Sequence, residues 1–98
     1  MGIVTSKVQS NTSERTVEFQ LSAPRAQSVN VCGTFNAWRT NAGHLTKDYL
    51  GVWKGSVSLR PGKYEYRFFV DGQWADDPRT KKTVANQFGS KNAVLEVK

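Results

Sequence analysis

Apolar and polar residues alternate with a period of two over much of the 98-residue chain from Thr16 onward. This period is typical of strands with one buried face. Turn-forming residues separate the alternating runs, and no segment carries the apolar stripe of an amphipathic helix. Short strands and regular turns over this length predict an all-β fold, an immunoglobulin-like antiparallel β-sandwich of the early-set type. The runs span residues 16–21, 29–32, 53–59, 64–70 and 93–98, and the turns lie at 23–25, 60–63 and 71–72.

The N-terminal segment differs from the rest of the chain. Residues 1–14 are polar and lack a sustained period, so we expect a flexible lead-in, with room for a short edge strand at Ile3–Val4, before one domain over residues 15–98. Met1–Ser6 fit the N-myristoylation pattern with Gly2 as acceptor, although so short a pattern is easily met by chance. We expect neither a signal peptide nor a membrane span, because no stretch is apolar and long enough.

Charge and cysteine content narrow the partners and the compartment. Lys and Arg outnumber Asp and Glu by 14 to 8, which keeps nucleic acid among the possible partners. The basic residues are scattered, however, and only Arg79, Lys81 and Lys82 lie close together, so nucleic acid is disfavoured. Cys32 is the single cysteine, which rules out an internal disulfide and favours a reducing, cytoplasmic location.

A hairpin can be read directly from the sequence. Asp71-Gly72 lies between two strand-like runs and indicates a type I′ turn, because both central residues of that turn need a positive φ. With these two residues as the loop, the strand pairing is fixed, and paired residues share one face of the sheet. The predicted pairs are Val70–Gln73, Phe69–Trp74 and Arg67–Asp76.

This pairing predicts an outward tryptophan. The apolar set of the strand must face the core, which places Trp74 and Arg67 together on the opposite face. An exposed indole beside a guanidinium indicates a ligand, because an indole packs against the flat apolar side of a sugar ring and Arg67 can donate to hydroxyl groups. The alternative is that the segment 78–91 covers Trp74, since tryptophan is usually well buried. The apolar set is Tyr64, Tyr66, Phe68 and Val70.

The two other tryptophans differ in how far the pattern places them. Trp53 is in phase with Val57 and Leu59, so we expect it in the core. Phe35 is expected to plug the core from a turn region. Trp38 follows in the same turn, where the period decides nothing, so its burial stays open.

Catalysis is not expected. Cleavage of a glycosidic bond needs two carboxylates facing one substrate, about 5–10 Å apart. Asp76 and Asp77 are adjacent in sequence and so point to opposite faces of a strand. Glu65 lies on the outward face, where we expect it to pair with Arg67.

No metal or cofactor site can be assembled from the remaining candidates. Cys32 and His44 are each the only residue of their type. We expect Cys32 to be an inert packed thiol and His44 to be a solvated loop residue.

Four sequence blocks also carry a family resemblance, in order and at near-family spacing. They resemble the family-48 carbohydrate-binding modules, which include the isoamylase N-terminal domain and the glycogen-binding domain of the β subunit of AMP-activated protein kinase. The resemblance covers the chain from about Thr16 to its end. The blocks are Gly33–Trp38, Gly51–Trp53, Pro61–Trp74 and Asp77–Pro78.

The resemblance implies non-catalytic binding of α-1,4-linked glucans such as glycogen, starch or maltooligosaccharides, in a targeting or regulatory role. It also implies a partner enzyme or kinase subunit in trans. Two alternatives remain: a nucleic-acid-binding β domain, and a protein-interaction module that kept only the fold. The chain departs from the family pattern by Arg67 in place of Lys and by one extra residue before Phe88. The carbohydrate-binding residues carried over are Trp38, Arg67, Trp74, Phe88, Ser90 and Asn92.

Overall fold

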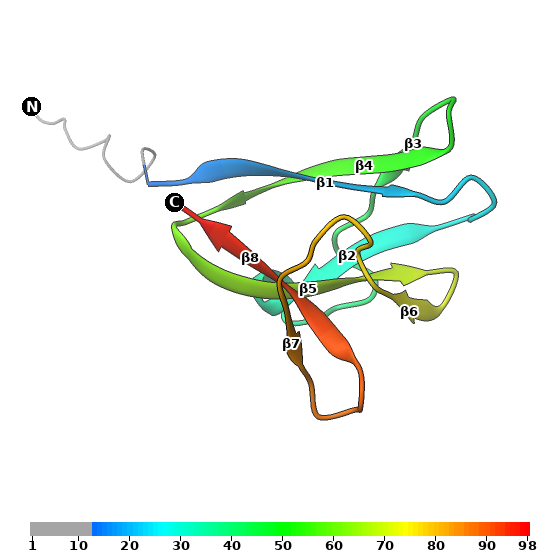
Figure 1. Ribbon diagram of the computed structural model, residues 1–98. Helices are drawn as coiled ribbons and strands as arrows, with labels where there is room; N and C mark the ends of the chain where they lie inside the picture. Colours follow the sequence, from blue (N-terminus) through cyan, green and yellow to red (C-terminus); the bar gives the residue numbers. More distant parts are fainter. Residues whose placement is uncertain (1–12) are drawn as a thin grey trace, which may run out of the picture.

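The protein is an antiparallel β-sandwich. A computed structural model describes residues 13–98, and Figure 1 shows two sheets of antiparallel strands packed against each other. These residues contain no α-helix and no helix able to cross a membrane. The predicted all-β sandwich is therefore confirmed. The Gly2 acceptor, the Ile3–Val4 strand and most of the predicted lead-in lie outside the described residues.

The smaller sheet has three strands in the order β1-β4-β3. Its long pair is β1 with β4, in a register that sets Leu21 opposite Trp53 and Phe19 opposite Gly55. The strands are β1 (Arg15–Ser22), β3 (Thr46–Lys47) and β4 (Val52–Leu59).

The larger sheet has five strands and centres on β5. This strand pairs with β2 and β8 in the order β2-β5-β8-β7, and β6 also pairs with β5. A single 3-10 turn, η2 (Thr34–Asn36), follows β2. The sequence did not predict β3, β7 or η2, because each is too short to show a period and all of β7 is exposed. The strands are β2 (Val29–Gly33), β5 (Gly62–Val70), β6 (Gln73–Ala75), β7 (Thr83–Ala85) and β8 (Lys91–Val97).

The predicted hairpin joins β5 to β6. Phe69 pairs with Trp74 and Val70 with Gln73, as the register required. Asp71 and Gly72 have φ values of 48° and 84°, both positive. The Asp71 carboxylate also accepts the backbone N–H groups of Gln27 and Ser28, which ties this turn to the loop before β2.

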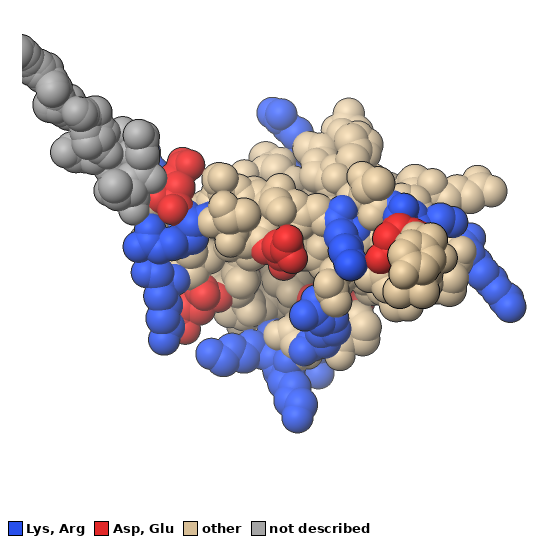
Figure 2. Space-filling model, turned by 90° about the horizontal axis from the view of Figure 1, so that it is seen from above, with Lys and Arg blue, Asp and Glu red and all other residues tan. Residues whose placement is uncertain are grey.

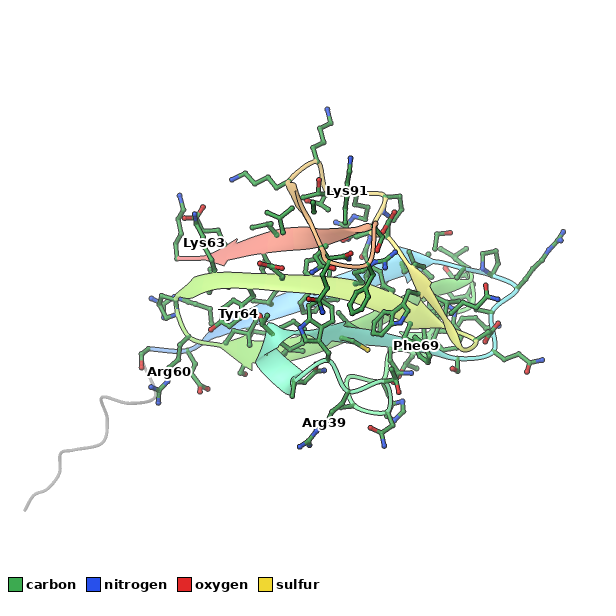
Figure 3. The ribbon with its side chains drawn as sticks, turned by 90° about the horizontal axis from the view of Figure 1, so that it is seen from below. Arg39, Arg60, Lys63, Tyr64, Phe69 and Lys91 are labelled. Carbon is green, nitrogen blue, oxygen red and sulfur yellow. The ribbon has the colours of Figure 1, made fainter. Side chains whose placement is uncertain are left out.

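The core lies between the two sheets. Phe68 is fully buried and Tyr66 nearly so, and both pack with residues of β1, β2 and β4. Phe35 stacks on Phe19 with ring centroids 5.6 Å apart, which confirms that it closes the core. Tyr64 and Val70, both predicted for the core, are only half-buried. For Tyr64 the reason is its hydroxyl, which donates to the Arg60 carbonyl at 2.7 Å near the end of the strand (Figure 3).

Charged side chains are spread over the surface. Figure 2 shows Lys and Arg distributed across one face with Asp and Glu among them. Lys54 pairs with Asp48 at 3.3 Å, and Lys82 approaches Glu96 at 3.9 Å. The scattered basic residues of the sequence therefore do not fold into one basic stripe on this face.

Trp53 anchors the packing of one sheet on the other. Its side chain is 7% exposed, and its indole N–H donates to the Ala23 carbonyl at 2.9 Å. The prediction that Trp53 belongs to the core is confirmed.

We predict that Trp53→Ala lowers the free energy of unfolding by about 3–5 kcal/mol, because the substitution empties a large core site. It also leaves the Ala23 carbonyl without its donor. Denaturant unfolding followed by circular dichroism measures this loss. An unfolding midpoint equal to that of the wild type would contradict the assignment of Trp53 to the core.

Candidate functional site

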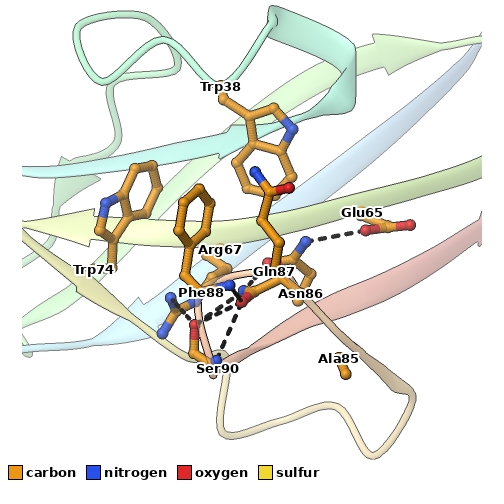
Figure 4. Close-up of a pocket in the computed structure, with 10 residues that line it drawn as sticks. Trp38, Glu65, Arg67, Trp74, Ala85, Asn86, Gln87, Phe88 and Ser90 are labelled. Atoms are coloured by element: carbon orange, nitrogen blue, oxygen red, sulfur yellow. Dashed lines mark hydrogen bonds between the residues drawn. The ribbon is translucent and has the colours of Figure 1, made fainter.

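One hollow on the outer face of the larger sheet gathers the predicted site residues. It has a volume of about 700 Å³ and is drawn in Figure 4. Its lining comes from the turn after η2, from β5, β6 and β8, and from the end of β7 with the turn that follows it. All six predicted carbohydrate-binding residues are among them. The lining residues are Trp38, Glu65, Arg67, Trp74, Ala85, Asn86, Gln87, Phe88, Ser90 and Asn92.

Aromatic rings form the apolar part of the hollow. Trp38 and Trp74 meet edge to face, with centroids 6.1 Å apart and an interplanar angle of 69°. Trp74 is 43% exposed, so the segment 78–91 does not cover it. Phe69 supports the indole of Trp74 from below, with centroids 4.9 Å apart. Phe88 is more exposed still, at 82%, and adds a third ring at the hollow.

A tight turn brings Trp38 to the hollow, which settles the position that the period left open. Ala37 and Trp38 both have φ of 58°, in the left-handed region that non-glycine residues rarely adopt. The side chain of Asn36 holds the preceding backbone: it accepts the Gly33 N–H at 3.0 Å and donates to the Val31 carbonyl at 3.0 Å. The Trp38 N–H in turn donates to the Gly33 carbonyl at 2.9 Å.

Gly33 allows this turn to lie close to β5. Its φ of −166° is ordinary extended backbone, so conformational freedom is not the reason for glycine. A Cβ at this position would lie 2.3 Å from the Glu65 carbonyl oxygen and 2.7 Å from the ring of Phe35. Glycine is therefore needed here to fit between β5 and the Phe35 ring.

Arg67 lies at the polar part of the hollow. Its guanidinium donates to Asp76 at 2.8 Å and to the Ser90 hydroxyl at 3.2 Å. The expectation that Glu65 pairs with Arg67 is wrong. Asp76 is the partner because the β5–β6 hairpin carries it back alongside Arg67, as the register had predicted. Within residues 13–98, the buried Nε of Arg67 has no hydrogen-bond partner.

Asn86 organises the turn between β7 and β8. Its Oδ1 accepts the backbone N–H groups of Phe88 at 3.0 Å and Ser90 at 3.1 Å. Its Nδ2 donates to the Oδ1 of Asn92 at 3.0 Å, and Asn92 donates to Glu65 at 3.0 Å. Sequence reasoning passed over Asn86. The available signal was an asparagine three residues before Gly89, which has a φ of 83° as such turns require.

The other candidates for chemistry are held apart from the hollow. Cys32 is fully buried, its thiol donates to the Arg39 carbonyl at 3.2 Å, and burial raises the thiol pKa. His44 is exposed. Both predictions are confirmed. Over the described part of the chain, no group of three His, Cys, Asp or Glu side chains could hold a metal ion.

The two adjacent aspartates serve different partners. Asp76 accepts from Arg67, whereas Asp77 accepts from the hydroxyl of Tyr66. Burial, and then this hydrogen bond to Asp77, raise the pKa of Tyr66. The prediction that the two carboxylates point apart is therefore confirmed.

Comparison with known proteins identifies the family. A family model described as the glycogen recognition site of AMP-activated protein kinase matches residues 15–98. The chain belongs to this family. The glycogen-recognition family is one of carbohydrate-binding modules, so the resemblance drawn from the sequence blocks is confirmed.

Members of the glycogen-recognition family occur within longer proteins. The β-2 subunit of 5'-AMP-activated protein kinase from Mus musculus is 34% identical over 74 residues, covering 74% of this chain and 26% of that protein. The human β-1 subunit is 35% identical over 72 residues, covering 74% and 25%. Protein PTST homolog 2, chloroplastic, from Arabidopsis thaliana is 45% identical over 53 residues, covering 54% and 10%. The chain thus spans about a quarter of the length of the kinase subunits it matches.

We predict that Gly33→Ala destabilises the fold by roughly 1–3 kcal/mol, because the new methyl group overpacks the contact with the Glu65 carbonyl. Thermal unfolding measures the loss. Gly72→Asn is the matched control, since nothing lies within 4 Å of a Cβ there and asparagine tolerates the positive φ. Equal melting temperatures for Gly33→Ala and the wild type would show that the strands can move apart without cost.

Proposed function

We propose that this domain binds α-1,4-linked glucans, such as glycogen, starch and maltooligosaccharides, without catalysing a reaction on them. One observation carries the proposal: six residues spread from position 38 to position 92 line a single hollow. Their types suit a sugar. Indoles pack on the apolar side of a pyranose ring, while amide, guanidinium and hydroxyl groups bond to its hydroxyls. The family match over residues 15–98 supports both the ligand class and the limits of the domain.

The indoles provide the platform. Trp38 and Trp74 are inclined to each other by 69°, so two sugar rings stacked on them are not coplanar. A chain of α-linked glucose units turns from one ring to the next and meets this requirement. Phe88 offers a further apolar surface beside the platform. Since the platform is small and partly solvated, we expect Kd values on the order of micromolar to millimolar.

Arg67 and Asn92 provide the donors. The guanidinium of Arg67 uses one N–H for Asp76 and one for Ser90, and it carries further N–H groups. Asn92 uses one of its amide hydrogens for Glu65 and keeps the other. These remaining donors are the groups that we assign to the sugar hydroxyls.

We propose a targeting or regulatory role, carried out with a partner enzyme or kinase subunit in trans. The relatives support this, because several are named as subunits of a protein kinase. The carboxylates Asp76 and Asp77 are engaged with Arg67 and Tyr66, which supports a non-catalytic role. The cytoplasmic location stays a prediction, since one relative is named chloroplastic.

Trp74→Ala is predicted to weaken retention on glycogen or amylose about tenfold or more, because it removes the most exposed indole of the hollow. Its melting temperature should stay close to that of the wild type. Affinity electrophoresis in gels with and without amylose measures the retention. Tyr49→Ala is the matched control, since Tyr49 is an exposed aromatic residue (94%) outside the hollow. Normal retention of Trp74→Ala would refute the platform.

Glucan binding should depend little on ionic strength, because the ligand is uncharged. We predict that retention on glycogen changes less than about twofold between 50 mM and 200 mM salt, whereas a phosphate-binding surface would lose affinity steeply over that range. A glycogen pull-down at both salt concentrations, with a single-stranded oligonucleotide in parallel, tests this. Salt-sensitive capture of the oligonucleotide without capture of glycogen would favour a nucleic-acid-binding domain, and capture of neither would favour a protein-interaction module.

A further inference from the structure

Two lining residues of the hollow, Glu65 and Asn86, lie outside the predicted carbohydrate-binding set, yet both bond to Asn92. The Nδ2 of Asn92 donates to Oε1 of Glu65 at 3.0 Å. The Oδ1 of Asn92 accepts from Nδ2 of Asn86 at 3.0 Å. The amide of Asn92 is therefore held at both of its polar atoms (Figure 4).

These contacts belong to a chain of hydrogen bonds with one direction. At one end, Arg67 can only donate, and at the other end the carboxylate of Glu65 can only accept. Between them, each hydroxyl or amide accepts from one neighbour and donates to the next. The chain runs from Arg67 Nη1 to Ser90 Oγ, from Ser90 Oγ to Asn86 Oδ1, from Asn86 Nδ2 to Asn92 Oδ1, and from Asn92 Nδ2 to Glu65 Oε1.

This direction fixes which atom of the Asn92 amide lies on which side. Turning the amide over would set its oxygen against the carboxylate of Glu65 and its NH₂ against the NH₂ of Asn86. Both contacts would be repulsive, and both hydrogen bonds would be lost. The asparagine consequently presents its remaining N–H and its remaining lone pair in one orientation before any ligand arrives.

We propose that Glu65 and Asn86 are positioning residues, which act on the glucan through Asn92 by fixing its amide. This inference rests on the proposed function, since it takes Asn92 as a sugar-binding donor. Ordering a polar side chain before binding removes that cost from the binding step. The carboxylate of Glu65 is suited to the task because it is not used by Arg67, which bonds to Asp76 instead.

Substitutions at position 65 separate positioning from other roles. Glu65→Leu removes the acceptor and should weaken binding of a linear maltooligosaccharide about five- to tenfold. Glu65→Gln keeps a carbonyl oxygen for Asn92 and should restore binding to within about twofold of the wild type. Glu18→Leu makes the same change at an exposed position of β1 outside the hollow and should leave binding unchanged. Isothermal titration calorimetry measures all of these affinities.

A double-mutant cycle tests whether Glu65 acts through Asn92. In an Asn92→Ala background, Glu65→Leu should weaken binding by less than about twofold, because nothing remains to be oriented. Asn86→Asp keeps the acceptor for the turn and loses the donor to Asn92, so it should resemble Glu65→Leu. Full loss with Glu65→Leu in the Asn92→Ala background, or a Glu65→Gln variant as weak as Glu65→Leu, would overturn the proposal in favour of direct contact between Glu65 and the sugar.

A readout without glucan keeps the two proposals separate. In the wild type and in Glu65→Gln, the Asn92 side-chain amide should give a resolved nuclear magnetic resonance signal with slowed hydrogen exchange, which Glu65→Leu should lose. Slowed exchange in a protein that fails to bind glycogen would sink the proposed function and leave the positioning of Asn92 intact. Rapid exchange in a wild type that binds glycogen would overturn the positioning and leave the function standing.

Discussion

The alternation of side chains along β5 couples the stability of the fold to the shape of the hollow. Tyr66 and Phe68 are buried in the core, whereas Arg67, between them, lines the hollow on the other face. The strand pairs with β2, β6 and β8, so its register sets the position of every element on the larger sheet except β7. A slip by one residue would bury the guanidinium and expose the two rings, at a cost of several kcal/mol. The core thereby enforces the position of Arg67.

Two asparagines extend this control to the turns around the sheet. Asn36 satisfies the backbone of Gly33 and Val31, and the turn it stabilises presents Trp38. Asn86 satisfies the backbone N–H groups of Phe88 and Ser90, and its turn presents Phe88. In both places a short amide replaces a neighbouring strand as hydrogen-bond partner. The exposed aromatic rings can thus be ordered without being packed, which is what a surface that stacks on sugars requires.

The sequence predicted the part of the hollow that depends on strands, and it failed where turns decide. The period of two and the Asp71-Gly72 turn were sufficient to place Trp74 beside Phe69 and opposite the core face. No period reaches Trp38, whose position depends on two left-handed residues and a side-chain amide. The residues from Phe88 to Asn92 came from the resemblance alone. Glu65 was assigned to Arg67 because both share a face of one strand, although the predicted register already set Asp76 on the adjacent strand.

Charge within the hollow differs from charge over the whole chain, and this difference bears on the ligand. The chain carries a formal net charge of +6, yet the lining contains one guanidinium, Arg67, and one carboxylate, Glu65. Asp76 compensates the guanidinium directly at 2.8 Å. Arg39 and Lys91, neighbours in sequence of lining residues, lie at opposite margins of the face seen in Figure 3 and do not line the hollow. A phosphate group in the hollow would meet the carboxylate of Glu65 and a guanidinium already neutralised, whereas a neutral polyol needs only the free N–H groups and lone pairs that the hydrogen-bond chain leaves. The basic surplus of the sequence therefore describes the surface as a whole, and the local balance of charge in the hollow favours an uncharged sugar.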